Sequence, residues 1–153
     1  MLKRIVLPNI MADEIFPGLF VGGTESCSKE ERKKLGITFT ICLVNRGEKH
    51  TTITNSLCLK VADELQQNLM IYFPGVCALI DQELDRGGKV LVHCWAGQSR
   101  SVTMVLAWLI HRGYTYGEAW ERMLQNHPEA TPNGSFRTQL REGEKMLSDK
   151  KAI

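Results

Sequence analysis

The segment HCWAGQSRS, residues 93–101, limits what this chain can fold into more than any other part of the sequence. It follows Lys89–His93 (KVLVH), which predicts a short buried strand. It precedes Val102–Arg112, a largely apolar stretch that predicts a helix ended by Gly113. A loop between a strand and a helix N-terminus exposes unpaired backbone N–H groups at the positive end of the helix dipole. The segment therefore predicts an anion-binding loop, and Gly97, without a side chain, eases its curl.

The rest of the chain alternates predicted strands and helices. Strands are predicted at Ile15–Gly23, Ile37–Val44 and Leu57–Val61. Helices are predicted after the capping-box pairs Ser28/Glu31 (ended by Gly36) and Thr115/Glu118, over Asn68–Arg86, and from about Asn133 onward. Pro74 fits the first turn of the long helix, with Asn68–Phe73 as a separate turn. This order predicts one α/β domain over residues 1–153, with a central, mostly parallel sheet flanked by helices.

The totals exclude several classes of protein. The chain has 153 residues, 43% of them apolar and 24% charged, which is ordinary for a soluble globular domain. A net charge of +2 is too small to predict binding to nucleic acid or to a membrane surface. The longest apolar run, Val102–Ile110, is far shorter than the roughly 20 residues that span a bilayer, and no signal peptide is visible. Five cysteines without a CxxC pair argue against a zinc site or a disulfide framework and favour a reducing, intracellular setting.

The predicted loop contains a nucleophile and an anion-binding side chain. Reactive cysteines at helix N-termini near cations reach pKa values of about 3.5–7.5, so we expect Cys94 to be a nucleophilic thiolate at neutral pH. Arg100 adds a planar guanidinium that can bind two phosphoryl oxygens at once. The expected phosphate-binding loop is made of Trp95, Ala96, Gly97, Gln98, Ser99 and Arg100. The alternative, a buried structural cysteine with a chance spacing to an arginine, is disfavoured by the setting between strand and helix.

HCWAGQSRS closely resembles the HCxxGxxRS active-site motif of protein tyrosine phosphatases, in particular the HCxAGxSRS form of the dual-specificity branch. Three further segments resemble that family in the same order. IFPGLFVGG is similar to its N-terminal strand, VADELQQNL to its general-acid loop and TPNGSFRTQL to its final helix. The resemblance covers roughly residues 10–147 and implies a small, atypical dual-specificity phosphatase.

The resemblance also implies catalytic roles. Asp63 stands 31 positions before Cys94 (94 − 63), at the place of the family's general acid, with Glu64 as the alternative acid. Ser101 resembles the hydroxyl residue that hydrogen-bonds the cysteine sulfur and helps it leave, and a helix-capping role could coexist with this one. Without the resemblance, Asp63 would be interpreted as a solvated loop carboxylate.

Four residues are expected to support the site. His93 is expected to orient the loop from behind, since no second metal ligand lies at a suitable spacing and no metal is predicted. Ser99 is expected to brace either the loop or Arg100. Trp95 either borders the pocket or packs against a neighbouring loop. Asn133 matches a family position that holds a loop near the base of the site.

The predicted reaction is cofactor-free hydrolysis of phosphotyrosine and phosphoserine or phosphothreonine in proteins, through a phosphocysteine. The expected partner is a phosphorylated protein, and the expected location is the cytoplasm, with the nucleus as an alternative. Three rivals remain open: a non-catalytic phosphate-binding module, a phosphatase of lipid or RNA phosphates, and a sulfur-transfer or arsenate-reducing enzyme. The other cysteines are expected to be buried, and one of Cys42, Cys58 and Cys77 could pair with Cys94 under oxidation.

Overall fold

A five-stranded sheet forms the centre of the molecule, with the strand order β1-β2-β5-β3-β4. The computed structural model describes residues 12–48 and 53–149. Its strands are β1 (Ala12–Phe16), β2 (Leu19–Gly22), β3 (Phe39–Val44), β4 (Ser56–Lys60) and β5 (Val90–His93). β1 pairs with β2 in the antiparallel direction, whereas β2–β5, β5–β3 and β3–β4 are parallel. The predicted mostly parallel sheet is therefore confirmed.

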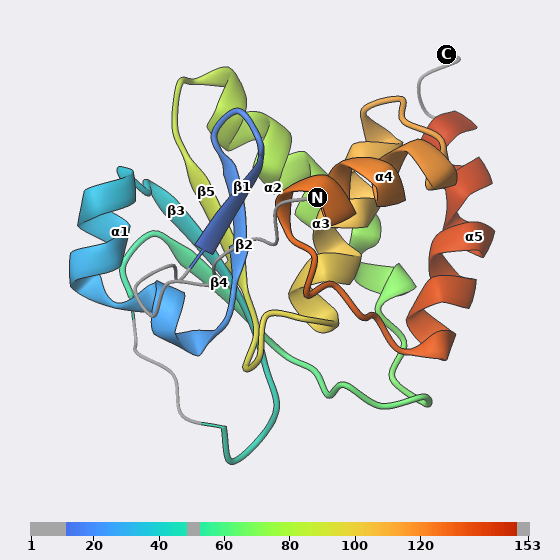
Figure 1. Cartoon of the computed structure of the whole chain (residues 1–153), viewed down its shortest axis with the longest axis horizontal. Helices are drawn as coiled ribbons and strands as arrows, with labels where there is room; N and C mark the ends of the chain where they lie inside the picture. Colours follow the sequence, from blue (N-terminus) through green and yellow to red (C-terminus); the bar gives the residue numbers. More distant parts are fainter. Residues whose placement is uncertain (1–11, 49–52, 150–153) are drawn as a thin grey trace, which may run out of the picture.

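Helices cover the sheet on two sides (Figure 1). They are α1 (Lys29–Leu35), α2 (Phe73–Asp85), α3 (Arg100–His111), α4 (Tyr116–Asn126) and α5 (Gly134–Asp149), with the 3₁₀ turns η1 (Thr24–Cys27) and η2 (Met70–Tyr72). Figure 1 shows α1 on one side of the strands and α2 to α5 gathered on the other. All residues of β2 and β5 are buried, as expected for parallel strands covered on both faces. The single α/β domain predicted from the sequence is confirmed.

The predicted strand Ile15–Gly23 is wrong in one respect, because the segment contains the end of β1, a turn and β2, which form a hairpin. Phe16 pairs with Leu19, and the chain reverses between them. Gly18 has φ +86°, a backbone conformation that glycine adopts without steric cost. Its N–H donates to the Glu14 carboxylate at 3.0 Å. The Pro-Gly pair at positions 17 and 18 is thus the turn between β1 and β2.

The predicted helix signals are confirmed. Thr115 and Glu118 form a reciprocal capping box at the start of α4. Ser28 accepts from the Glu31 N–H, and Gly36 ends α1 in the left-handed conformation. Pro74 lies in the first turn of α2, directly after η2.

Helix α3 is buried along almost its whole length, from Arg100 to Ile110. It packs against α2, α4 and α5. On its last turns, Trp108 donates to Asp81 of α2 at 2.9 Å. A helix enclosed in this way has little freedom to shift, so its N-terminus is held directly against the end of β5. No helix in the two described ranges is both long enough and apolar enough to cross a bilayer.

Candidate active site

The loop of residues 94–99 joins β5 to α3 and is anchored by its carbonyl groups. The carbonyl oxygen of Trp95 accepts from the Thr24 N–H at 3.0 Å, and that of Gln98 accepts from the Thr131 N–H at 2.7 Å. The Gly97 carbonyl oxygen lies 2.6 Å from Nε2 of His127. In a trans peptide the C=O and the following N–H point in opposite directions. Each anchored carbonyl therefore turns the next N–H to the opposite side of the loop.

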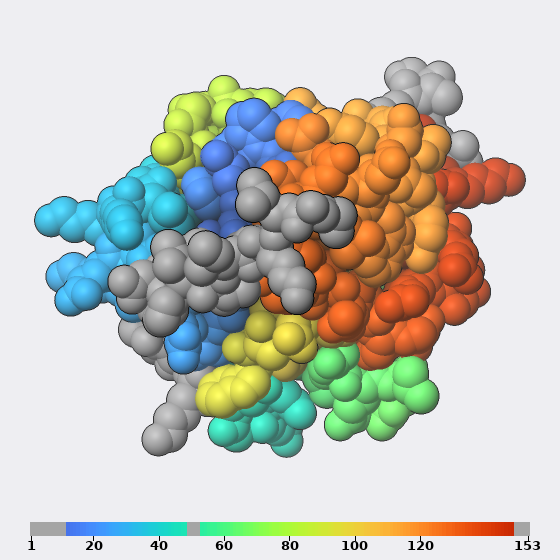
Figure 2. Space-filling view, viewed as in Figure 1, coloured from blue at the N-terminus to red at the C-terminus, as the bar shows by residue number. Residues whose placement is uncertain are grey.

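These N–H groups are available to a ligand. Over residues 12–48 and 53–149, the N–H groups of residues 95–99 donate no hydrogen bond to another residue. In the same part of the chain, the buried Nε of Arg100 has no partner either. A buried donor without an acceptor, such as this Nε, is rare because it costs free energy. Unpaired N–H groups at the N-terminus of a buried helix form an anion-binding cradle. In Figure 2 the yellow loop lies at the surface, beside the green segment that follows β4.

Gly97 lets the loop approach β2 closely. Its φ is +73°, and a Cβ built on it would lie 2.6 Å from the Gly23 nitrogen and 2.7 Å from the Gly22 carbonyl carbon. Both are backbone atoms, so no side chain can move aside. The glycine is required by both the conformation and the space.

Replacing Gly97 with alanine should displace the loop. We expect a loss of about 1–3 kcal/mol in the free energy of unfolding, the usual range for a non-glycine residue held at positive φ, and at least a tenfold loss of affinity for a tetrahedral anion. Urea denaturation and calorimetry with such an anion measure the two effects. Gly117→Ala is the matched control, because Gly117 lies in α4 and its nearest neighbour to a new Cβ is 4.0 Å away. The Gly117→Ala variant should be stabilised by about 0.5–1 kcal/mol. Equal changes in the free energy of unfolding of the two variants would contradict the requirement for glycine at position 97.

Cys94 is buried, and its Sγ lies 3.1 Å from the hydroxyl of Ser101. Ser101 lies in the first turn of α3 and is fully buried. The sequence left open a capping role for Ser101, but the helix begins at Arg100, and the recorded hydroxyl contact is to the sulfur. The hydroxyl is thus within hydrogen-bond distance of the sulfur at the base of the loop.

Arg100 is held by a residue that sequence reasoning missed. Its two terminal nitrogens donate to the two carboxylate oxygens of Glu48 at 2.7 and 3.0 Å, and one of them also donates to the Val61 carbonyl at 3.0 Å. The hydrogen bond from Arg100 lowers the pKa of Glu48 despite partial burial. Burial lowers the pKa of Arg100, but the Glu48 bond and the charges of Cys94, Glu48 and Asp63 outweigh it, so the pKa is raised. The guanidinium is therefore charged and fixed in plane.

A sequence signal for Glu48 did exist. It is the single acidic residue in the polar stretch 45–56, and a buried arginine needs a countercharge. The sequence alone did not indicate that Glu48 reaches Arg100. His50, in the same stretch, lies outside the described residues.

Asp63 lies on the exposed segment after β4 and contacts the loop through one oxygen. Its Oδ1 accepts from the Ser99 hydroxyl at 2.6 Å and from Nδ2 of Asn133 at 2.9 Å. The Ser99 hydroxyl in turn accepts from the Asn133 N–H at 3.1 Å. Ser99 therefore links the loop to Asp63 and Asn133, and not to Arg100. Glu64, the alternative acid, instead accepts from Gln66.

The remaining predicted residues surround the loop. The Trp95 side chain is half exposed, which favours the border of the site over packing against a neighbouring loop. His93 is buried at the end of β5, in register with Cys42 and Gly22. Ala96 and Gln98 contribute backbone to the loop, which Gly97 bends.

The cysteines differ from expectation at one position. Cys42 and Cys77 are buried as predicted, but Cys58 is exposed on β4, because β4 is an edge strand of the sheet. Burial raises the pKa of Cys42, and so does a contact with the Cys58 thiol. The recorded thiol partner of Cys42 is thus Cys58.

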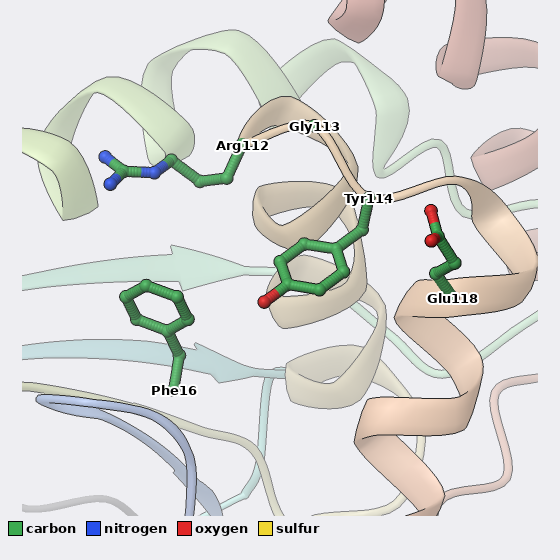
Figure 3. A pocket seen from close by; sticks show the side chains of 5 residues that line it. All are labelled: Phe16, Arg112, Gly113, Tyr114 and Glu118. Atoms are coloured by element: carbon green, nitrogen blue, oxygen red, sulfur yellow. The ribbon is translucent and has the colours of Figure 1, made fainter.

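A separate pocket of about 410 Å³ lies at the other end of α3. Phe16, Arg112, Gly113, Tyr114 and Glu118 line it (Figure 3). The guanidinium of Arg112 lies 5.9 Å from the centre of the Phe16 ring. A helix of twelve residues is about 18 Å long, so this pocket is remote from Cys94.

Comparisons with known proteins identify the family that this geometry fits. The sequence model of the family described as "Dual specificity phosphatase, catalytic domain" matches residues 19–146. The chain belongs to the dual specificity phosphatase family. Dual specificity protein phosphatase Mpk3 of Drosophila melanogaster is 37% identical over 141 residues, covering 88% of this chain and 34% of the relative. Dual specificity protein phosphatase 1B of Arabidopsis thaliana is 34% identical over 137 residues, covering 88% of this chain and 82% of the relative.

Solved structures agree with this assignment. The human tyrosine phosphatase-like serine/threonine/tyrosine-interacting protein superposes with a TM-score of 0.84 at 35% identity, covering 89% of this chain and 97% of that one. A mouse putative dual specificity phosphatase complexed with zinc tungstate has a TM-score of 0.85 at 26% identity, with coverage of 99% and 97%. The chain spans about a third of the length of the Drosophila relative but most of the Arabidopsis relative.

Proposed function

We propose that this member of the dual specificity phosphatase family hydrolyses phosphotyrosine and phosphoserine or phosphothreonine in proteins, through a phosphocysteine on Cys94. The observation that carries the proposal is the position of Cys94. Its sulfur contacts Ser101 at the centre of a loop whose N–H groups and Arg100 Nε are available to an oxyanion.

In the first step, the Cys94 thiolate attacks phosphorus, so that the S–P bond forms and the ester P–O bond breaks. The N–H groups and Arg100 stabilise the charge on the equatorial oxygens. Asp63 donates its proton to the leaving oxygen. Since Oδ1 already accepts two hydrogen bonds, we assign the transferred proton to Oδ2.

In the second step, the Asp63 carboxylate takes a proton from water. The water oxygen attacks phosphorus, the P–S bond breaks, and inorganic phosphate is released. Ser101, at 3.1 Å from the sulfur, donates to the departing thiolate. The thiolate is regenerated, so that proton and phosphoryl transfers balance over the cycle.

The rivals predict different chemistry. A binding module needs no nucleophile, whereas Cys94 here has its sulfur partner and a charged Arg100. A lipid or RNA phosphatase often carries more basic residues in the loop, and Arg100 alone is charged between positions 94 and 101. The cytoplasmic or nuclear location stays a prediction.

One activity panel tests the proposal. We expect turnover of phosphotyrosyl and phosphothreonyl peptides, with phosphoinositide and RNA 5′-triphosphate at least tenfold slower in kcat/KM. Preferential hydrolysis of either non-protein substrate would overturn the substrate class. Binding of phosphate without turnover of any substrate would favour the binding module.

Replacing Asp63 with asparagine tests the general acid. We expect kcat/KM, which reports the first step, to fall by roughly 100-fold for alkyl phosphates, whose leaving oxygen needs the proton, and by much less for aryl phosphates with acidic leaving groups. A plot of log kcat/KM against leaving-group pKa measures this, and Glu64→Gln is the matched control on the neighbouring carboxylate. Equal losses for good and poor leaving groups would move the acid elsewhere, with Glu64 next to test.

A further inference from the structure

His127 is the residue that follows α4, and it lies directly behind the phosphate loop. The residue is 7% exposed, and both ring nitrogens are in hydrogen-bond contact. Nε2 lies 2.6 Å from the Gly97 carbonyl oxygen, and Nδ1 lies 2.7 Å from Oδ2 of Asp13 on β1. The ring therefore connects the loop to β1, one of the two edge strands of the sheet.

Both contacts of the ring are with acceptors. A backbone carbonyl has no proton to give, and neither does an ionised carboxylate. A neutral imidazole carries one N–H, so one of its nitrogens would point a lone pair at an oxygen. The imidazolium carries two N–H groups and satisfies both contacts. The geometry thus fits the charged ring.

The charges around the ring favour the same form. Two carboxylates face the ring. Asp13 comes from β1, and Glu129, at 3.4 Å, comes from the segment between α4 and α5. The loop presents the Gly97 carbonyl to the same ring. Burial lowers the pKa of His127, but the bonds to Asp13 and Gly97 and the two negative charges outweigh it, and the pKa is raised.

The Gly97 carbonyl is a sensitive point of the loop. It belongs to the same peptide as the N–H of Gln98, which points the opposite way. A charged donor on the carbonyl both fixes the peptide plane and polarises that N–H, which strengthens it toward an anion. Gly97 has a positive φ that an isolated loop does not strongly prefer over others, so an external contact is needed to select it.

We propose that His127, as an imidazolium bridging Asp13 and the Gly97 carbonyl, is a positioning residue that holds the phosphate loop in its anion-binding form and makes anion affinity depend on pH. The bridge is complete while the ring holds both protons. Because the pKa is raised, it stays complete above the ordinary pKa of histidine, about 6.5. One of the two bonds is lost as the pH rises through the raised value. This inference rests on the proposed phosphate site, but not on turnover.

Sulfate, a tetrahedral oxyanion with constant charge between pH 6 and pH 9, is the probe, and its affinity is measured by calorimetry in the Cys94→Ser background. That background removes the titration of the thiol. In the Cys94→Ser protein with no other change, we expect the affinity to fall about tenfold as the pH rises through the titration of His127. His127→Arg, with a permanent charge and several donors, should keep the high affinity throughout. His127→Gln should bind about tenfold more weakly at pH 6 and show no such decline.

The Asp13→Asn variant tests whether His127 positions the loop or only fills space behind it. Removing the carboxylate should shift the decline in affinity to lower pH, because Asp13 favours the charged ring. His111→Gln is the control at the far end of α3 and should leave the profile unchanged. NMR of the His127 ring in the otherwise unaltered chain should find both nitrogens protonated at pH 7.

Several outcomes would overturn the proposal. These are a neutral ring at pH 7, an unchanged pH profile in Asp13→Asn, or loss of affinity in His127→Arg equal to that in His127→Gln. The proposal would also be overturned if one Zn²⁺ ion, at a physiological zinc concentration, bound to the His127 ring and abolished its titration. A metal ion would then take the place of the second ring proton. A catalytically silent protein that still showed the titration would refute the proposed phosphatase activity and leave the His127 bridge intact.

Discussion

Replacing Cys94 with serine should abolish turnover of an aryl phosphate while leaving phosphate binding in place. A serine hydroxyl at this position is a far weaker nucleophile than a thiolate, and loss of a catalytic nucleophile can cost about 10⁶ in kcat. We expect at least a 10⁴-fold loss. The N–H cradle and Arg100 do not depend on the sulfur, so tungstate or phosphate should still bind. Steady-state kinetics and calorimetry measure the two quantities separately.

Cys58→Ser is the matched control for that change. Cys58 is a second cysteine, exposed on the edge strand β4, and its replacement should leave kcat within about twofold. Residual activity of more than a few per cent in Cys94→Ser would sink the phosphocysteine mechanism. Loss of phosphate binding in the same variant would show that the sulfur also shapes the cradle.

Replacing Arg100 with lysine should lower kcat by roughly 10²–10³-fold, the usual cost of losing a donor to a developing oxyanion. The guanidinium uses both terminal nitrogens on Glu48 and one on Val61 while its Nε has no partner in the described part of the chain. A lysine keeps the charge but offers one nitrogen, which cannot hold Glu48 and a phosphoryl oxygen in one plane. Single-turnover kinetics with an aryl phosphate would show the slowed phosphorylation step.

Arg112→Lys provides the comparison for Arg100→Lys. Arg112 caps the other end of α3 and pairs with Asp81 at 3.3 Å on the surface, where an exposed pair contributes little. Its replacement should change kcat by less than twofold. If Arg100→Lys retained activity within a few-fold of the unaltered chain, charge alone would suffice and the planar fork would be unnecessary.

Local signals predicted much of the fold. The signals were the capping box at Thr115, the left-handed Gly36 and the position of Pro74. Each of them involves only residues within one turn of its own helix. Such contacts depend on side chains a few positions apart, so their spacing in the sequence suffices. The missed turn at residues 17 and 18 shows the limit, because one short apolar segment fits either a strand or half of a hairpin.

The edge position of β4 was not predictable either. Its sequence resembles that of a buried strand, and Cys58 was expected to be buried. Burial depends on where a strand lies in the sheet, and the order β1-β2-β5-β3-β4 leaves β4 with one neighbour. Neighbours in that order are far apart in the chain, so a local pattern does not specify them.

The sequence by itself determined the phosphate loop, because Cys94, Gly97, Arg100 and Ser101 are nearly contiguous and take their geometry from one strand and one helix. Family resemblance added Asp63 as the expected acid. The tertiary structure alone decided what holds the loop: Glu48 reaches Arg100 across 52 positions, and His127 connects Gly97 to Asp13 across 30 and 114 positions. Nothing in the local pattern sets contacts between segments so distant, since they form only when the packing of α3 against the sheet brings those segments together.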